Sequence, residues 1–172
     1  MASNTPLKLL LILLFLVLCT PYSRAFVEKK MVFYMHDTST GSKITAIRVA
    51  GVNGSSSDLV AFGTVLVTDD LLTEGVEPSS KVVGRAKGMY SYADLKGASL
   101  TLALSAVFEN EKFNGSTLQF QGVDPFFQSP REVSVVGGTG QFRYARGYAA
   151  LYDARITGFN TIVVFNITLR LD

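Results

Sequence analysis

Cysteine is almost absent from this sequence: Cys19 is the only one among 172 residues. It lies in an N-terminal segment that has the features of a removable signal peptide, so we expect the mature chain to carry no thiol. A secreted domain without cysteine forms no disulfide, has no thiolate nucleophile and binds no metal through sulfur. Its stability must therefore come from its hydrophobic core or from contacts between subunits.

Histidine is equally scarce, with His36 as the only one. This excludes metal sites built from several histidines. A Ser–His–Asp triad would have to use His36, although no serine stands in a nucleophile-elbow motif. A lone histidine at a strand end is more often structural than catalytic. Asp69-Asp70 could bind a cation, but an aspartate pair that closes a strand usually belongs to a turn. We therefore predict neither a metal nor a cofactor.

Long runs of one charge are also missing. Lys8 and Arg24 leave with the signal peptide, so the 16 basic residues fall to 14 in the mature chain, against 14 acidic ones. The mature chain is then formally neutral. Without a basic run or a basic amphipathic helix, nothing indicates binding to nucleic acid or to a membrane surface.

The N-terminal segment, residues 1–25, is predicted to be a secretory signal peptide. Lys8 precedes an unbroken apolar run at residues 9–18, and Ser-Arg-Ala at residues 23–25 places small side chains at positions −3 and −1 of a cleavage site. The apolar run is too short to span a bilayer. We expect cleavage after Ala25, a mature domain of residues 26–172, and secretion to the extracellular space.

What the mature chain has instead is a series of short segments rich in β-forming residues. No segment of helical length keeps a 3.6-residue period. Turn signals recur at the spacing of an all-β sandwich or barrel, and a closed barrel removes the exposed edges of such apolar strands. We predict a single all-β domain, an antiparallel barrel of eight or nine strands, with strands at residues 31–36, 44–52, 61–68, 82–92, 100–108, 117–123, 131–136, 141–152 and 161–171.

A hairpin is marked within residues 131–148, where two strand-like runs flank Gly137-Gly138-Thr139-Gly140. The glycines of this segment can adopt positive φ without steric cost. The segment lacks the Lys-Ser/Thr pair of a phosphate-binding loop and lies between strands. We therefore interpret it as a hairpin turn.

Residues 82–92 indicate what the interior of the barrel contains. Tyr90 and Tyr92 share one face with small residues at positions 84, 86 and 88. Small residues followed by two phenols could line an open cavity with a polar end. Alternatively, the glycines only permit the curvature of the barrel. The sequence leaves both interpretations open.

The candidates for chemistry are carboxylates, phenols and an arginine. A carboxyl group that points into an apolar barrel has a raised pKa and can act as a general acid near neutral or mildly acidic pH. A nearby arginine would hold a phenolate or carbonyl oxygen, and phenols would stack on or hydrogen-bond an aromatic ligand. The candidate residues are Asp37, Tyr90, Tyr92, Asp124, Arg131 and Asp153.

Three sequons make the mature chain a candidate glycoprotein, at Asn53, Asn114 and Asn166. The first two lie in turns rich in glycine and serine, where an acceptor asparagine is accessible. Asn166 lies inside a strand pattern and is usable only if its side chain faces outward, so we rank it third.

Five stretches of the chain, in order, resemble the plant dirigent family. They are V-F-Y-M-H-D (32–37), T-D-D-L-L-T-E-G (68–75), V-G-R-A-K-G-M-Y (83–90), F-N-G-S-T-L (113–118) and S-V-V-G-G-T-G-Q-F-R-Y-A-R-G-Y (134–148). The resemblance covers essentially the whole mature chain. It implies an eight-stranded antiparallel β-barrel, like that of allene oxide cyclases, that assembles as a homodimer or homotrimer and is secreted to the apoplast.

The resemblance also implies a role in phenylpropanoid chemistry. Dirigent proteins have no oxidative centre of their own. A separate oxidase of the laccase or peroxidase type makes phenoxy radicals from a monolignol such as coniferyl alcohol, and the dirigent protein directs their stereoselective coupling to lignans. By similarity, Asp37 and Asp124 match the pocket aspartates thought to protonate a quinone methide. Arg131 matches the pocket arginine and Tyr90 the pocket tyrosine, with Tyr92 on the same face.

Two features depart from lignan-forming members. The chain lacks the cysteine pair that commonly ties the N-terminal segment to the last strand, and it has Asp153 where threonine is usual. Both features favour broader dirigent-like branches, some of whose members dehydrate isoflavanols to pterocarpans. Three functions remain open: a stereo-directing protein, a dehydratase or cyclase that uses the same aspartates, and a barrel that only binds hydrophobic aromatic molecules.

Overall fold

The computed structural model describes residues 27–51 and 60–171, and in these ranges the chain forms nine antiparallel strands. The expected signal peptide and the Asn53 sequon lie outside the described residues. No helix in the described ranges is long and apolar enough to cross a membrane. The elements are β1 (Val27–Asp37), β2 (Ala46–Ala50), β3 (Val65–Thr73), β4 (Val82–Ser91), β5 (Leu100–Phe108), β6 (Thr117–Asp124), β7 (Arg131–Thr139), the short 3-10 helix η2 (Gly140–Phe142), β8 (Arg146–Thr157) and β9 (Asn160–Leu171).

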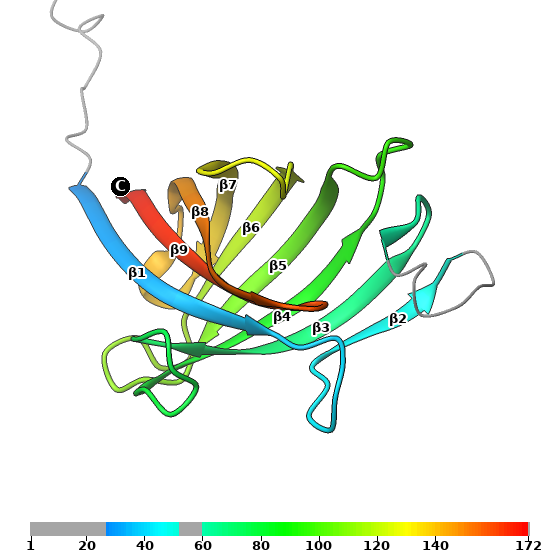
Figure 1. Cartoon of the computed structure of the whole chain (residues 1–172). Coiled ribbons are helices and arrows are strands. Elements are labelled where there is room, and N and C mark those ends of the chain that lie inside the picture. The colour runs from blue at the N-terminus through cyan, green and yellow to red at the C-terminus, as the bar shows by residue number, and fades with distance from the viewer. Residues whose placement is uncertain (1–26, 52–59, 172) are drawn as a thin grey trace, which may run out of the picture.

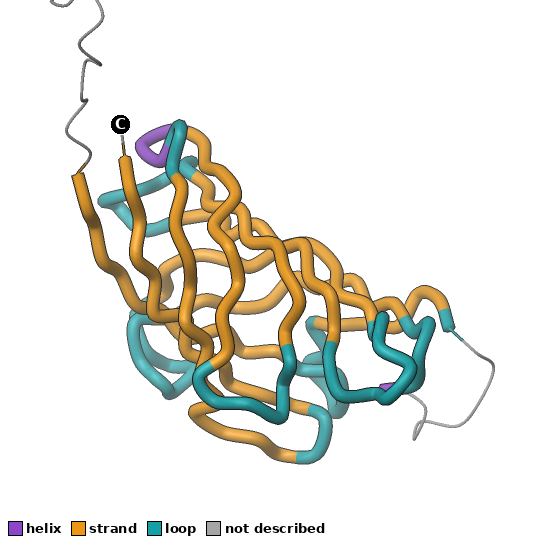
Figure 2. Tube along the Cα trace, turned by 90° about the horizontal axis from the view of Figure 1, so that it is seen from above, coloured by secondary structure: helices purple, strands orange, loops and turns teal. Residues whose placement is uncertain are grey.

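Eight of these strands close into a barrel. They follow the order β1-β9-β8-β7-β6-β5-β4-β3, and β1 pairs with β3 to complete the ring. Figure 1 shows the strands curving around a common interior, and Figure 2 shows the same sheet from above. β2 pairs with the other half of β3: Ala46 lies opposite Thr68, whereas His36 of β1 lies opposite Leu71. The prediction of an eight-stranded antiparallel β-barrel is confirmed.

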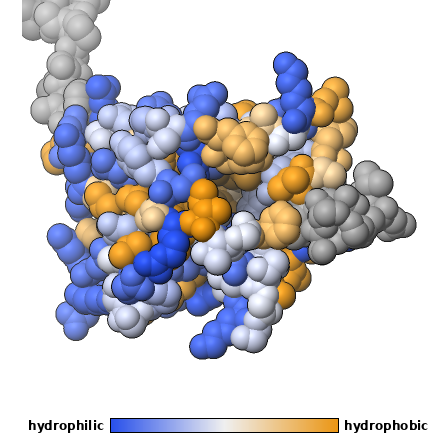
Figure 3. Space-filling view, in the orientation of Figure 1, coloured by the Kyte–Doolittle hydropathy of each residue, from blue (hydrophilic) through white to orange (hydrophobic). Residues whose placement is uncertain are grey.

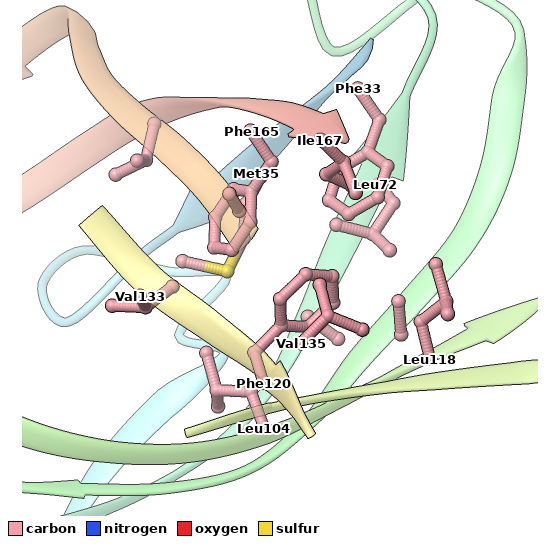
Figure 4. Packing of buried hydrophobic residues seen from close by; sticks show 14 of the residues in the cluster. Phe33, Met35, Leu72, Leu104, Leu118, Phe120, Val133, Val135, Phe165 and Ile167 are labelled. Atoms are coloured by element: carbon pink, nitrogen blue, oxygen red, sulfur yellow. The ribbon is translucent and has the colours of Figure 1, made fainter. Parts of the chain in front are cut away.

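Inward-facing side chains fill one end of the barrel with hydrophobic residues, many of them aromatic (Figure 4). Phe33 on β1 lies at the centre of this cluster. Its ring centroid is 5.2 Å from that of Phe165, 6.3 Å from that of Phe120 and 6.4 Å from that of Phe108. Aromatic pairs at such distances add to the stability gained from burial alone. The candidate site lies at the opposite end of the barrel.

β3 extends further than the sequence indicated. The sequence places a turn at Asp69-Asp70 and a loop after it, but β3 continues through both residues to Thr73. The turn prediction is wrong because pairing with β4 and β1 outweighs the preference of aspartate for turns. Asp70 is buried on the inner face together with Thr68 and Leu72, whereas Asp69 is exposed on the outer face.

The hairpin between β7 and β8 exists, but its turn lies later than predicted. β7 runs through Gly137 and Gly138 to Thr139, and residues 140–145 form the turn. Among the four residues expected to turn, Gly140 alone has a positive φ, +60°. Gly138 is needed for another reason, since a Cβ there would collide with the carbonyl oxygen of Phe142, a fully buried residue. Close packing rather than turn geometry therefore explains Gly138.

The glycines of β4 favour the interpretation based on curvature. A Cβ at Gly84 would collide with the carbonyl oxygen of Val107 on β5, and a Cβ at Gly88 would collide with that of Ala103. These glycines let the two strands approach closely as the sheet bends. A cavity does lie beside the tyrosines at the end of β4, but the glycines do not line it.

We expect Gly88→Ala to lower the free energy of unfolding by more than about 1 kcal/mol, as measured by urea denaturation. The added methyl group would collide with the carbonyl oxygen of Ala103, and residue 88 has a φ of +156°. Gly158→Ala is the matched control, because residue 158 has a φ of +62° but no atom within 4 Å of the added carbon. Equal losses in the two variants would contradict the close-approach explanation.

The outer face of the barrel carries a row of exposed hydrophobic side chains. Ile47 on β2 lies opposite Val67 on β3, which lies opposite Met89 on β4. All three are exposed, Ile47 by 55% and Met89 by 52%. Figure 3 shows hydrophobic side chains gathered on the side of the molecule that carries β2 and β3. Contiguous exposed hydrophobic groups are typical of surfaces that another molecule covers.

Candidate active site

A cavity of about 340 Å³ lies at the end of the barrel where β1, β4, β6 and β8 end and where β3, β5, β7 and β9 begin. Its walls are largely apolar, and exposed Phe127 and Phe159 lie at its mouth. The structure brings all six residues predicted from the sequence together in the lining of this cavity: Asp37, Tyr90, Tyr92, Asp124, Arg131 and Asp153.

Asp37, the last residue of β1, presents a carboxyl group that can hold a proton near neutral pH. The phenol of Tyr90 donates a hydrogen bond to it, and the Ser39 hydroxyl donates another at 3.3 Å. Burial raises the pKa of Asp37 to about 6, even though both hydrogen bonds favour the ionised form. A carboxylic acid with such a pKa can donate a proton to a bound ligand in a mildly acidic medium.

Tyr90 and Tyr92 form the phenolic wall of the cavity. Their ring centroids are 6.3 Å apart in an edge-to-face arrangement, and Phe126 packs on Tyr92 at 6.0 Å. Burial, followed by the charge of Asp37, raises the pKa of both phenols, that of Tyr92 to about 12. Both tyrosines are therefore neutral over the physiological pH range and can donate hydrogen bonds beside an aromatic ligand.

Arg131 lies at the start of β7 and binds two carboxylates at once. Its Nε atom is 2.5 Å from Oδ1 of Asp124, while Nη1 and Nη2 donate to Asp153 at 2.9 and 2.6 Å. The arginine side chain is only 2% exposed. Burial raises the pKa of Asp124 although the charge of Arg131 opposes the increase. The planar guanidinium thus fixes the position of both carboxylates.

Asp70 is a fourth carboxyl group near the cavity, which the sequence indicated as a possible cation ligand or a turn residue but did not place in the site. It is fully buried on the inner face of β3, and the Thr45 hydroxyl donates a hydrogen bond of 2.5 Å to its Oδ1 atom. Burial, and then the charge of Asp37, raises the pKa of Asp70 to about 7. Leu66, Thr68, Asp70 and Leu72 stand at every second position, a pattern that indicates one buried face of a strand. Because the aspartate pair favours turns, the predicted strand ends before Asp70.

His36 and the sequons at Asn114 and Asn166 lie away from the cavity. The His36 ring is buried on the other face of β1, where Nε2 lies 2.7 Å from the hydroxyl of Thr73, and burial lowers its pKa. These contacts fit the structural role expected of a lone histidine.

Asn114 is exposed in the turn between β5 and β6. Asn166 is exposed on the outer face of β9, which is the orientation that glycosylation of this residue requires.

Within the described ranges, no group of three or more histidine, cysteine, aspartate or glutamate residues could hold a metal ion. The chemistry that the cavity can perform with its own side chains is proton transfer. Asp37 can supply a proton, Asp124 provides a second carboxyl group, and the phenols can bind polar atoms of an aromatic ligand.

The family described as Dirigent-like protein matches residues 28–170 of the chain. The chain belongs to the dirigent family. Dirigent protein 1 of Arabidopsis thaliana is 42% identical over 150 residues, which make up 86% of this chain and 82% of that protein. Pterocarpan synthase 1 of Glycyrrhiza echinata is 39% identical over 154 residues, again 86% of this chain and 82% of that protein.

A solved structure supports the same conclusion. The pterocarpan synthase dirigent protein GePTS1 aligns with a TM-score of 0.78 and 34% identity, over 88% of this chain and 94% of that one. The dirigent resemblance noted in the sequence is thereby confirmed. The relatives of this dirigent chain include proteins named dirigent proteins and proteins named pterocarpan synthases. Family membership alone therefore does not decide which of these two activities the chain has.

Proposed function

We propose that this dirigent protein binds phenoxy radicals of a monolignol such as coniferyl alcohol and directs their stereoselective coupling to a lignan. The observation that carries the proposal is the placement of Asp37, a carboxyl group with a raised pKa, beside the phenol of Tyr90 in a cavity with apolar walls. The apolar walls suit the aromatic rings, and the carboxyl group suits the oxygen that must receive a proton.

The proposed chemistry divides between two proteins. A separate oxidase of the laccase or peroxidase type removes one electron and one proton from each monolignol. Two radicals then combine in the cavity through their side-chain carbons, which forms a carbon–carbon bond and leaves a quinone methide in each half of the product. Asp37 donates its proton to a quinone methide oxygen, the side-chain hydroxyl of the other half closes a ring on the methide carbon, and the proton of that hydroxyl returns to a cavity carboxylate. The second quinone methide closes in the same way. Ring closure therefore consumes no net proton and no electron.

In this proposal Asp124, Arg131 and Asp153 act as a group. Arg131 contacts both aspartates, so one cation serves two carboxyl groups within the cluster. Asp124 is the second candidate acid, because burial raises its pKa in spite of Arg131. Tyr92 and Tyr90 orient the phenolic rings through hydrogen bonds and edge contacts.

The test is chiral chromatography of coniferyl alcohol coupling products formed by a one-electron oxidant, with and without the purified protein. We expect an excess of one enantiomer that grows with protein concentration, and no product when the oxidant is left out. Racemic product at every protein concentration would refute the stereo-directing function. The boiled protein serves as a control for effects of added protein on the oxidant.

A second candidate function is dehydration and ring closure of an isoflavanol to a pterocarpan. Relatives named pterocarpan synthases, among them the solved structure GePTS1, favour this candidate. Here a cavity acid would protonate the leaving hydroxyl group, water would depart, and a phenolic hydroxyl of the same molecule would close the ring and release a proton. This reaction needs no oxidant, so turnover of an isoflavanol without oxidant would select it over radical coupling.

We also propose that the protein is secreted to the apoplast, carries glycans at accessible sequons, and forms a homodimer or homotrimer. Dirigent family proteins are generally secreted, and Asn114 and Asn166 are both exposed.

The exposed row of Ile47, Val67 and Met89 offers a hydrophobic surface that a second copy would bury. Sedimentation velocity of wild-type protein and of Val67→Lys would test the assembly, with dissociation expected in the variant.

A further inference from the structure

We propose that Asp70 and Asp37 form a carboxyl pair that shares a proton, with Asp70 as a positioning residue that passes this proton to Asp37 after Asp37 has protonated a ligand. The proposal rests on the function proposed above for Asp37. It adds a residue that does not line the cavity and therefore acts through its neighbour.

The strand register places the two carboxyl groups together. In the antiparallel pairing of β1 with β3, Tyr34 lies opposite Thr73, Met35 opposite Leu72 and His36 opposite Leu71. The paired residues end there, and the same register continued by one position brings Asp37 beside Asp70, whose pKa responds to the charge of Asp37. Residues directly opposite each other point to the same face, with Cβ atoms about 4.5–5.5 Å apart. Both side chains accordingly face the interior, at the point where β1 leaves β3.

Asp70 has no cation as a direct partner in the described part of the chain. Its Oδ1 atom accepts a hydrogen bond from the hydroxyl of Thr45, and the hydroxyl of Thr68 is the second hydrogen-bonding group beside it. Both of these partners are neutral. Arg85 on β4 is the cation that acts on it, but the Arg85 guanidinium contacts the carboxylate of Asp69 on the outer face. A buried carboxylate with no cation beside it is costly, so Asp70 favours its protonated form.

The other charged and titratable groups near the pair do not neutralise it. Arg131 is already bound by two carboxylates, and Tyr90 and Tyr92 are neutral. Asp37 also borders an outer cavity that contains three basic side chains. Arg155 is bound to Glu77, His36 to Thr73, and Lys43 is exposed to solvent. The charged and titratable groups around the pair are His36, Lys43, Glu77 and Arg155 on the outer side, Asp69, Arg85 and Lys87 on β3 and β4, and Tyr90, Tyr92, Asp124, Arg131 and Asp153 inside the barrel.

Two like charges at this separation cannot both form readily. Burial, and then the charge of ionised Asp37, raises the pKa of Asp70 to about 7, above the value of about 6 for Asp37. Interacting groups of this kind titrate as a pair, in two steps that belong to both residues. Between these two pH values the pair keeps one proton. That proton passes to Asp37 from the buried side while a ligand fills the cavity. The proton that the closing hydroxyl releases then returns to the pair, so that both carboxyl groups end as they began.

The experiment is a pH titration of carboxyl carbons by NMR in protein labelled with ¹³C-aspartate. In wild-type protein we expect two coupled steps, near pH 6 and near pH 7. Asp70→Asn should remove the upper step, and Asp37→Asn should lower the titration midpoint of Asp70 by about one pH unit or more, because the neighbouring charge is gone. Asp69→Asn, which removes an exposed carboxylate one residue away, should leave both steps in place.

An upper step that stays near pH 7 in Asp37→Asn would overturn the proposal, as would a wild-type titration with no aspartate above about pH 5. The titration needs no substrate, so its outcome is independent of the proposed function. If Asp70→Asn does not fold, infrared spectroscopy of wild-type protein replaces it: a protonated carboxyl band that persists above pH 6 supports the pair, and its absence refutes it.

The functional readout is the pH profile of enantiomeric excess. In Asp70→Asn we expect the upper limit of the stereoselective range to fall by up to about one pH unit, while selectivity at low pH is kept. A purely structural role of Asp70 would lower selectivity equally at every pH, and that result would contradict the proposal.

Discussion

Replacing Arg131 by methionine is expected to lower the free energy of unfolding by about 3–5 kcal/mol at neutral pH. The guanidinium is 2% exposed and contacts both Asp124 and Asp153. Methionine fills a similar volume but leaves two carboxylates in a largely apolar barrel without a cation. Removing one partner of a buried ionic group is far more damaging than removing the whole group, because the remaining charges have lost their solvent. Urea denaturation measures the change.

The matched control is Arg85→Met. Arg85 also contacts an aspartate at 2.6 Å, but the side chain of this partner, Asp69, is 54% exposed. An exposed ion pair contributes about 0–1 kcal/mol, so the control should lose no more than that. Combining Arg131→Met with Asp124→Asn and Asp153→Asn should restore part of the stability. Equal losses for Arg131→Met and Arg85→Met would contradict the assignment of the cluster as a buried ionic group.

The loss in Arg131→Met should also depend on pH. Burial already raises the pKa of Asp124 above its ordinary value, and removal of the arginine would raise it further. A carboxyl group whose pKa is higher in the folded than in the unfolded state stabilises the fold at low pH, and this stabilisation is lost as the pH rises through the folded value. The deficit relative to wild type should therefore be smallest near pH 4 and largest at pH 7 and above.

Replacing Asp37 by asparagine is expected to abolish stereoselectivity and, if the reaction is an oxidant-free ring closure, to slow it by about 10²–10⁴-fold. Asparagine keeps the size of the side chain and can accept the hydrogen bond from Tyr90, but it has no proton to give. The measurements are enantiomeric excess by chiral chromatography and initial rate. Unchanged selectivity and rate would remove Asp37 from the mechanism.

The same variant should be at least as stable as wild type at neutral pH. The pKa of Asp37 is raised to about 6 from an ordinary 3.8, so its stabilising contribution is full below pH 3.8 and lost as the pH rises through 6. The neutral asparagine side chain escapes this cost, which amounts to roughly 3 kcal/mol at most. A variant that is inactive yet stable separates the chemical role from a structural one. Asp69→Asn, on the outer face, is the control for both measurements.

The sequence predicted the class of fold because the strands carry strong local signals. The expected strand at residues 100–108 coincides with β5, where buried and exposed residues alternate before Glu109 ends the run. The sequence predicts the turn of the β7–β8 hairpin too early because it contains Gly138. This glycine is needed to avoid a collision with Phe142, and no rule about turn residues contains that contact. The predicted strand ends before Asp69, whereas β3 continues to Thr73. Aspartate favours turns in any sequence, and the local sequence does not show that neighbouring strands pair with these residues.

The sequence predicts which residues form the site better than it predicts which of them contact each other. All six candidates line one cavity, but the contacts of Arg131 with Asp124 and Asp153 arise because the ends of β6, β7 and β8 meet in the barrel. The proximity of Asp70 to Asp37 likewise depends on the register between β1 and β3, whose pairing ends one position short of them. Strand register over such sequence separations follows from the whole closed sheet, and no local pattern contains it.

The central claim is that Asp37 in its protonated form controls the outcome of the reaction in the cavity. The most direct measurement is the enantiomeric excess of coniferyl alcohol coupling products as a function of pH, with a chemical one-electron oxidant and with wild-type protein and Asp37→Asn in parallel. We predict high selectivity with the wild type below about pH 6, a decline as Asp37 and then Asp70 ionise, and racemic product with the variant throughout. A wild-type excess that does not change with pH, or an equal excess with Asp37→Asn, would contradict the claim.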